Sequence, residues 1–466
     1  MSASVDLTPP QDLHIVGIGG AGMSAIASVL AAMGHRVSGS DLKESKALDR
    51  LADQGLRVAV GHEAEHLGEA AVVARSTAIG DGNPEVVAAR ERGLPVLRRS
   101  EVLAAITDLR RTISVAGTHG KTTTSSMLAV VLGEAGLDPS FIIGGDVHQI
   151  GSGAVWSEGD WFVVEADESD GTFVELTTEV AVVTNVEPDH HAHYGDFAAL
   201  RDAFDQFVVG ASGLAVVGID DEEGAALAAR HPGVVTVGEA DGATYRITDL
   251  RREPRGTTFH LVHEARELGE LHLPVPGAHN ARNAAVAAAT ALEVGASFEA
   301  ASAALARFGG VARRFEFRGE AAGVSFVDDY AHLPTEVTAA LAAARDTAPE
   351  RLVAVFQPHR YTRVHALADE FGRSFVDADL VIVTDVYSAG ETPIPGVSGM
   401  AVVSAVRRDD PERQVEYLPR REDLVSGLVN RLKAGDLCVT LGAGDLTTLP
   451  DELQAALSAR PSPPSP

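Results

Sequence analysis

A run of branched apolar residues, a glycine-rich turn and a helical pattern follow one another at three places along the chain. The first begins at "LHIVGIGGAGMSAIASVLAAMG", the second at "TISVAGTHGKTTT", and the third includes "VSFVDDY" and "RLVAVFQPHR". This succession is typical of parallel βαβ units, whose strands are connected by helices. The sequence therefore predicts an α/β fold of three domains, spanning residues 1–108, 109–313 and 314–466.

Composition and charge limit the classes of function. The chain has 466 residues and a formal net charge of −28. Because nucleic acids and acidic membranes bind basic surfaces, this charge argues against both as partners. The uncharged stretch 15–33 is long enough for a membrane span, but its glycines favour a strand, a glycine loop and a helix, so we expect no anchor. The single cysteine, Cys438, lies in the apolar run "DLCVTLGAG", which predicts a buried reduced thiol in the cytoplasm.

The first glycine loop is typical of a nucleotide site. Gly17, Gly19 and Gly22 form GxGxxG between a predicted strand and a predicted helix, and Asp41 closes the next strand. Glycine at these places lets backbone N–H groups approach a diphosphate at the helix N-terminus. A tight turn without a ligand has the same glycines, and the pattern does not distinguish NAD from another nucleotide. Taken alone, this loop indicates an NAD-binding oxidoreductase.

The second glycine loop, "GTHGKTTT", is two residues shorter than the usual GxxxxGK[ST] phosphate loop. It follows an apolar strand and opens a helix, so the amides around Gly117 and Gly120 can form an anion nest. Lys121 would neutralise phosphate charge, and Thr122 would ligate Mg²⁺. A lysine at the positive end of a helix is unfavourable unless an anion binds there. The loop therefore predicts a nucleotide phosphate site.

Carboxylates and histidines follow the next two predicted strands. Glu165 comes directly after "FVV", where parallel sheets place metal ligands. For the rest of "EADESD", a solvated acidic turn and a functional site remain equally good interpretations. The loop "EPDHHAHYGD" brings His190, His191 and His193 together; without cysteine or HExxH, one histidine assisting Mg²⁺ fits better than a zinc site. At the head of a later helix, Asn280 and Asn283 share one face and can both contact a nucleotide, although Asn280 also fits a plain helix cap.

These motifs, taken in order, resemble those of the Mur ligase family of peptidoglycan synthesis. The matching segments lie in all three predicted domains: "GIGGAGMSAIA", "GTHGKTTT", "EADESD", "NVEPDHH", "PGAHNARNAA", "ARRFEF", "DDYAHLPTEV", "QPHRYTR" and "YSAGETPIPG". The resemblance implies an N-terminal Rossmann-like domain for the UDP of a muramyl substrate, a central P-loop ATPase-type domain with a mixed sheet, and a C-terminal Rossmann-like domain for an amino acid. It also implies ATP and two Mg²⁺ ions as cofactors, and it replaces NAD by UDP in the first loop.

The resemblance assigns roles residue by residue. The catalytic set is Lys121, Glu165 and His190, and the metal ligands are Thr122, Glu165 and His190. The ATP-binding set is Gly117, Thr118, His119, Gly120, Lys121, Thr122, Thr123, Asn280, Asn283, Arg314, Asp329 and His332. The UDP-substrate set is Gly17, Gly19, Gly20, Gly22, Asp41 and His191. The amino-acid set is Tyr330, His359, Arg360 and Arg363.

Within the family, the chain resembles members that join L-alanine to the lactyl carboxylate of UDP-N-acetylmuramate through an acyl phosphate. Later-acting members carry a carbamylated lysine, and here no lysine occurs between Lys121 and Lys433. The alternative within the family is a murein-recycling member that adds a tripeptide; the distant alternatives are an NAD-binding oxidoreductase and a non-enzymatic nucleotide-binding scaffold. Two departures leave roles open: Leu333 replaces a second histidine, and the usual serine pair is changed near Arg75 and Ser76. We expect a cytoplasmic monomer or homodimer.

Overall fold

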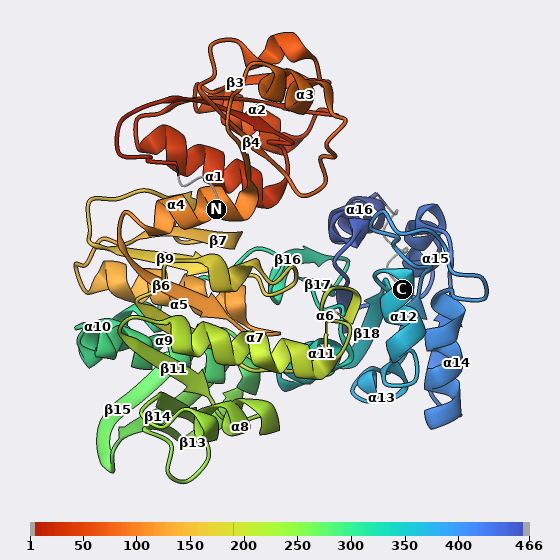
Figure 1. Ribbon diagram of the computed structural model, residues 1–466. Helices are drawn as coiled ribbons and strands as arrows, with labels where there is room; N and C mark the ends of the chain where they lie inside the picture. Colours follow the sequence, from red (N-terminus) through yellow and green to blue (C-terminus); the bar gives the residue numbers. More distant parts are fainter. Residues whose placement is uncertain (1–4, 190, 460–466) are drawn as a thin grey trace. The chain divides into compact units, whose positions relative to one another are not determined.

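The computed structural model describes residues 5–189 and 191–459. Within this range the chain forms three β-sheets flanked by helices, coloured in Figure 1 from red through green to blue along the sequence. It divides into two compact units: residues up to 248 with 260–271 and 282–308, and residues 249–259 with 272–281 and those from 309 onward. The first unit contains the first sheet and most of the second, and the second unit contains the third. The predicted α/β class is confirmed.

The first sheet carries the first glycine loop. Its strands are β1 (Asp12–Val16), β2 (Arg36–Asp41), β3 (Arg57–Val60), β4 (Val72–Arg75) and β5 (Val96–Arg98). Its helices are α1 (Ala21–Ala32), α2 (Lys46–Asp53), α3 (Pro84–Glu91) and α4 (Arg99–Thr107). The strands lie in the order β3-β2-β1-β4-β5, and each adjacent pair is parallel. Side-chain caps fix two helix starts: Ser45 accepts the amide of Leu48, and Asn83 caps α3 before Pro84.

The second sheet carries the phosphate loop. Its strands are β6 (Arg111–Ala116), β7 (Ser140–Val147), β8 (Ser152–Val155), β9 (Trp161–Glu165), β10 (Val180–Val183), β11 (Leu214–Gly218), β12 (Val235–Gly238), β13 (Tyr245–Glu253), β14 (Gly256–His263) and β15 (Arg266–Leu273). The helices are α5 (Lys121–Glu134), α6 (His191–Tyr194), α7 (Phe197–Gly210), α8 (Glu222–Arg230), α9 (Ala278–Glu293) and α10 (Phe298–Leu305). The strand order is β15-β14-β13-β12-β11-β10-β6-β9-β7-β8, and β6 is parallel to both neighbours. The loop after β6 therefore lies between the loops after β9 and β10.

The third sheet belongs to the second unit. Its strands are β16 (Glu316–Ala321), β17 (Val324–Asp329), β18 (Arg351–Phe356), β19 (Leu380–Val383), β20 (Gln414–Tyr417) and β21 (Asp436–Leu441). The helices are α11 (Pro334–Asp346), α12 (Tyr361–Leu367), α13 (Phe371–Ser374), α14 (Gly399–Asp409), α15 (Leu424–Val429) and α16 (Leu449–Ser458). The order is β16-β17-β21-β18-β19-β20; β16 is antiparallel to β17 and the other pairs are parallel. Cys438, in the central strand β21, is fully buried as expected, and burial raises the pKa of its thiol to about 12.

The predicted domain boundaries fall in connections between elements. Residue 108 directly follows α4, and residue 313 lies between α10 and β16. Both boundaries stay predictions. None of the helices formed by residues 5–189 and 191–459 combines the length and the apolar character that a bilayer crossing requires.

Candidate active site

The first glycine loop is held in a conformation that requires glycine. Gly17 has φ +81°, and a Cβ there would lie 2.9 Å from the Cβ of Ser76. The Gly17 amide donates to the carbonyl of Ser40 at 2.8 Å. The Gly19 amide donates to Oδ2 of Asp41 at 2.9 Å. The predicted Asp41 thus supports the loop itself, and its contact with a ribose or base stays a prediction.

A cavity of about 530 Å³ connects this loop to the second sheet. Gly20 is the N-cap of α1, so the cavity lies at the N-terminal end of that helix. The lining includes Gly19 and Gly22 from the loop, Arg99 from α4, Gly144 from β7, and Glu165 and Asp167 at and after the end of β9. Residues predicted to bind UDP and a residue predicted to bind metal therefore share one cavity. The sequence did not indicate Arg99.

The phosphate loop follows β6 and also depends on two glycines. Gly117 has φ +134°, and a Cβ there would lie 2.1 Å from Oγ1 of Thr184. Gly120 has φ +78°, and a Cβ there would lie 2.4 Å from Oδ1 of Asn283. Any larger residue would have to displace these neighbours. The structure therefore brings the predicted Asn283, on α9, directly to the loop.

The segment after β10 holds the middle of the phosphate loop. The amides of Thr118 and His119 donate to the carbonyl and to Oδ1 of Asn185, at 3.2 and 2.9 Å. Asn185 Nδ2 donates back to the carbonyl of His119 at 2.9 Å. His119 Nε2 lies 3.1 Å from Oε2 of Glu187. Asn185 and Glu187, which sequence reasoning missed, therefore fix the loop shape.

Lys121 begins α5 and points its ammonium group back into the loop. Its Nζ donates to the carbonyl of Gly117 at 2.6 Å and to Oε1 of Glu168 at 2.9 Å. Glu168 is fully buried. Burial alone would lower the pKa of Lys121, but the carboxylates of Glu168, Asp167 and Glu165 outweigh it and the pKa is raised. The lysine is therefore a fixed cation, and Glu168 is its buried partner rather than part of a solvated turn.

Oxygen donors of the kind that Mg²⁺ prefers lie near the lysine. Thr122 is buried in the first turn of α5, and Glu165 ends β9, where its Oε2 accepts the amide of Gly144 at 2.8 Å. Burial raises the pKa of Asp167, but Lys121 and hydrogen bonds from Ser169 outweigh this, so the pKa is lowered and the carboxylate stays charged. Within residues 5–189 and 191–459, no three His, Cys, Asp or Glu side chains converge into a preformed metal cage. Thr122 and Glu165 fit a hard cation chemically, and their metal role stays a prediction.

The sequence predicts that His190 and His191 lie beside these ligands, and this stays a prediction. His190 lies outside the described residues, and of His191 only the backbone, as the first residue of α6, is described. Of the asparagine pair, Asn280 donates its side-chain amide to the carbonyl of Pro276 at 2.8 Å and is buried. Asn280 lies inside the first turn of α9, which begins at Ala278, so it is not the N-cap that the alternative interpretation expects. Asn283, one turn further on, reaches the phosphate loop.

In the second unit, Asp329 fastens the segment that carries Arg314. Asp329 Oδ2 accepts the amide of Phe315, and Oδ1 accepts the amide of Ala331, both at 2.7 Å. Burial raises the pKa of Asp329 to about 6, although Arg314 opposes this. The Arg314 guanidinium lies 4.9 Å from the centre of the Tyr330 ring, a cation–π arrangement. Three predicted residues thus form one group at the end of β17.

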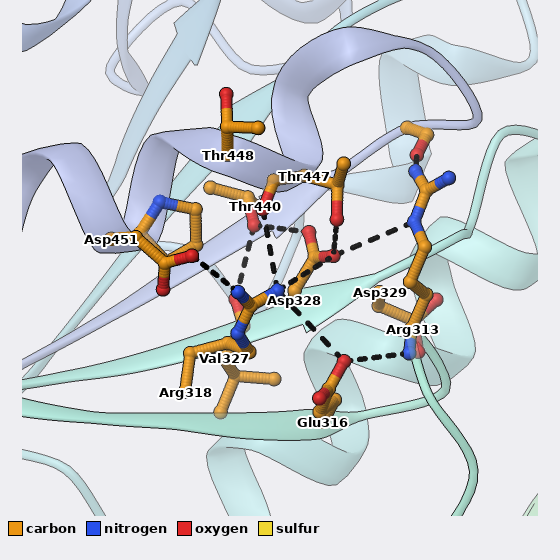
Figure 2. Close-up of polar contacts among 12 residues, drawn as sticks. Arg313, Glu316, Arg318, Val327, Asp328, Asp329, Thr440, Thr447, Thr448 and Asp451 are labelled. Atoms are coloured by element: carbon orange, nitrogen blue, oxygen red, sulfur yellow. Dashed lines mark hydrogen bonds and ion pairs between the residues drawn. The ribbon is translucent and has the colours of Figure 1, made fainter. Parts of the chain in front are cut away.

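A neighbouring acid, Asp328, is the centre of a network that the sequence did not indicate (Figure 2). Oδ1 of Asp328 accepts the hydroxyl of Thr440 at 2.6 Å, and Oδ2 accepts that of Thr447 at 2.7 Å. Arg313 Nε lies 3.6 Å from Oδ2, and its Nη2 donates to the carbonyl of Gly442 at 2.7 Å. Arg313 has φ +61°, which side chains rarely adopt. The side chain of Arg313 thus lies between the buried carboxylate of Asp328 and the carbonyl of Gly442, and its backbone conformation is strained.

The residues predicted to bind the amino acid follow strands β17 and β18, where several aromatic rings contact one another in series. The rings of His332 and His359 are edge to face with centres 5.6 Å apart, and those of His359 and Tyr387 are stacked at 5.8 Å. Arg363 Nη1 donates to Nδ1 of His359 at 3.1 Å. Arg360 has φ +67° and donates its amide to the carbonyl of Tyr387 at 2.9 Å. The structure thus groups His332, His359 and Arg363, and adds Tyr387.

Comparison with known proteins identifies the family to which a chain with these two loops and this arginine–histidine group belongs. Family models described as "Mur ligase family, catalytic domain", "Mur ligase middle domain" and "Mur ligase, glutamate ligase domain" match residues 12–111, 115–291 and 313–444. A UDP-N-acetylmuramate–L-alanine ligase of Agrobacterium fabrum is 46% identical over 457 residues, which cover 95% of this chain and 97% of that protein. The chain belongs to the Mur ligase family. A ligase of the same name from Myxococcus xanthus is 47% identical over 452 residues, 96% of both chains.

Solved Mur ligase structures agree with the fold. A UDP-N-acetylmuramate-alanine ligase from Thermotoga maritima has a TM-score of 0.82 at 28% identity, covering 96% of this chain and 99% of that one. A murein peptide ligase from Psychrobacter arcticus has a TM-score of 0.71 at 25% identity, covering 97% and 100%. The predicted family and three-domain fold are confirmed. Because the Mur ligase match includes the first glycine loop, that loop is explained without NAD.

The two departures from the Mur ligase motifs have structural accounts. Leu333 is buried at the start of α11, and its amide donates to Oε2 of Glu336 at 3.1 Å. Arg75 Nη1 pairs with Asp81 at 2.9 Å and donates to the carbonyl of Ile79 at 3.0 Å. Both residues therefore serve local structure in this Mur ligase.

Proposed function

We propose that this chain joins L-alanine to the lactyl carboxylate of UDP-N-acetylmuramate, with hydrolysis of ATP to ADP and phosphate, in peptidoglycan-precursor synthesis. The observation that carries the proposal is the 46–47% identity to alanine ligases across at least 95% of the chain. The geometry supports it, because a glycine loop, a phosphate loop with its lysine and an arginine–histidine group all belong to one chain.

The chemistry requires an activated acid, because a carboxylate does not react with an amine at neutral pH. A lactyl carboxylate oxygen attacks the γ-phosphorus of ATP, the bond from that phosphorus to the β–γ bridging oxygen breaks, and an acyl phosphate and ADP form. The amine nitrogen of alanine then attacks the acyl carbon. The tetrahedral intermediate collapses to the amide and phosphate, and the amine proton leaves to solvent. The protein's contribution is positioning and electrostatic stabilisation.

The first unit supplies the positive charge for the phosphoryl transfer. The amides between Gly117 and Thr122 lie at the N-terminus of α5, where backbone N–H groups favour phosphate. Lys121, kept charged by three carboxylates, would stabilise the transferred group. Bound Mg²⁺, in our proposal two ions, would neutralise phosphate charge and would be held by Thr122 and Glu165, with His190 as the third ligand expected from the sequence.

The second unit supplies groups for the amino acid and for ATP. We assign the carboxylate of alanine to His359, Arg360 and Arg363, since guanidinium groups bind carboxylates through charge-assisted hydrogen bonds. The hydrogen bond between Arg363 and His359 supports this assignment because it fixes both side chains. Tyr330 joins the amino-acid set, and Arg314, Asp329 and His332 are assigned to ATP.

Phosphate release tests the proposal. Purified protein is incubated with ATP, Mg²⁺ and UDP-N-acetylmuramate, and L-alanine is compared with the tripeptide L-alanyl-γ-D-glutamyl-meso-diaminopimelate. We expect release with L-alanine. Preference for the tripeptide would instead support the murein-recycling alternative. The structural similarity to the murein peptide ligase of Psychrobacter arcticus is the reason for testing that alternative. No release with either would overturn both.

Location and assembly belong to the same proposal. UDP-sugars and ATP are cytoplasmic metabolites, so we place the protein in the cytoplasm. The net charge of −28 supports a protein without nucleic-acid or membrane partners. We expect a monomer or homodimer, which light scattering on the purified chain distinguishes.

A further inference from the structure

The cavity of the first unit contains a cation to which the proposed reaction gives no role. Arg99 is the first residue of α4 and lines the cavity together with Gly19 and Gly22. A Cβ built on Gly22 would lie 2.7 Å from Nε and 3.1 Å from Cζ of Arg99. The guanidinium therefore packs directly against the first turn of α1, and a side chain at position 22 would have to displace it.

This position is electrostatically unfavourable for the empty protein. The N-terminus of a helix carries partial positive charge, so a guanidinium beside it is repelled unless an anion lies between them. Nε of Arg99 is buried and has no hydrogen-bond partner among the described residues. Asp167 also lines the cavity. Burial raises the pKa of Asp167, whereas Lys121 and, to a smaller extent, Arg99 lower it. This interaction with Asp167 still leaves the buried Nε of Arg99 without a hydrogen-bond partner in the part of the chain that the structure describes.

We propose that Arg99 binds the diphosphate of the UDP-sugar substrate. The inference rests on the proposed function and adds a residue to its substrate site. A diphosphate at the N-terminus of α1 would accept hydrogen bonds from the loop amides on one side and from the guanidinium on the other. The lactyl carboxylate of the substrate is a less suitable ligand for Arg99. In the proposed reaction it must lie near Lys121, where the phosphoryl group is transferred, and not beside α1. Arginine suits this role because its planar fork binds phosphate oxygens in pairs.

The preceding residue provides a matched control. Arg98 has the same charge, but its side chain is 50% exposed and pairs with Glu101 and Glu175 at 3.6 and 3.4 Å. Arg98 does not line the cavity. Substituting Arg98 therefore removes one positive charge from the same segment without touching the proposed diphosphate site.

Calorimetric titration with UDP and with UDP-N-acetylmuramate tests the inference on the full chain. We expect R99A to weaken both ligands by about the same factor, about 10- to 100-fold, as loss of a charged hydrogen-bond pair does. R98A should change neither by more than about twofold. The UDP affinity of R99A should also depend less on salt, which a merely structural role would not produce.

Several results would overturn the inference. Unchanged UDP affinity in R99A would do so, and so would weakening of UDP-N-acetylmuramate alone, which would assign the guanidinium to the lactyl carboxylate. Where R99A does not fold, R99K, which keeps the charge and loses the fork, gives the same comparison of both ligands. The titration needs no turnover: a wild-type chain that binds UDP but releases no phosphate would refute the proposed function and not this inference.

Discussion

Lys121 Nζ and Glu168 Oε1 form a 2.9 Å ion pair, and the carboxylate is completely buried. Removing one member of a buried pair leaves the other charge unpaired, which costs about 3–5 kcal/mol. The pair therefore couples the stability of the first unit to the residue proposed to bind ATP phosphates.

Lys121→Met should abolish phosphate release, by at least about 100-fold, and lower the free energy of unfolding by about 3 kcal/mol. The double variant Lys121→Met/Glu168→Leu should recover most of that stability and none of the activity. Denaturant unfolding and phosphate release on the same samples measure both effects. Phosphate release at the wild-type rate in Lys121→Met would contradict the mechanism.

Gly120→Ala should damage the phosphate loop. The new Cβ would meet Oδ1 of Asn283 at 2.4 Å in a backbone with φ +78°, so we expect about 1–3 kcal/mol of destabilisation and weaker ATP binding. Gly133→Ala is the control. Gly133 lies in α5 with nothing near its Cβ position, so alanine there should stabilise by about 0.5–1 kcal/mol. Equal behaviour of the two variants in thermal unfolding and nucleotide titration would argue against this account.

Asp328→Asn should disturb the network of Figure 2. Its side-chain amide cannot accept from both Thr440 and Thr447 while facing Arg313, so we expect about 2–4 kcal/mol of destabilisation and a raised KM for ATP. Asp451 pairs with Arg318, whose Nη1 lies 3.9 Å from Oδ2 of Asp328, so it belongs to the edge of the same network (Figure 2). Because Asp451 is 59% exposed, Asp451→Asn should cost about 1 kcal/mol or less. Chemical unfolding and steady-state kinetics of both variants check this. A large loss in Asp451→Asn alone would show that Asp328 is not the centre.

Glu85 should make the stability of the first sheet sensitive to acid. Burial would raise its pKa, but hydrogen bonds with His14, Ser40 and His66 outweigh this and lower the pKa to about 2. The unfolded chain therefore binds the proton more tightly, so this contribution to stability is complete above about pH 5 and is lost as the pH falls toward 2. Glu85→Gln should be less stable at pH 7 and should lose less stability between pH 5 and 3. Parallel pH-dependent curves for the two proteins in denaturant unfolding would refute this.

Local patterns predicted the features that depend on local geometry. Gly17, Gly117 and Gly120 were predicted from loops between strands and helices, and the structure shows that backbone angle and close approach require them. Lys121 was predicted because a cation beside a helix start needs a counter-charge.

Residues defined by distant contacts could not be predicted in this way. Glu168 is one of several acids in "EADESD", and only the folded loop selects it as the partner of Lys121. Arg99 contacts Gly22, which is far from it in sequence, and no spacing rule connects the two. Asp328 and Asp329 are adjacent acids whose different partners follow from the alternation of side chains along β17.

The buried thiol of Cys438 has a practical consequence for experiments on this enzyme. With a pKa of about 12 and no exposed surface, it will not react with maleimides while the chain is folded. The natural sequence is thus already suited to site-specific fluorescent labelling, and one engineered cysteine at a solvent-facing position such as Val209, which is 70% exposed, would carry a single dye.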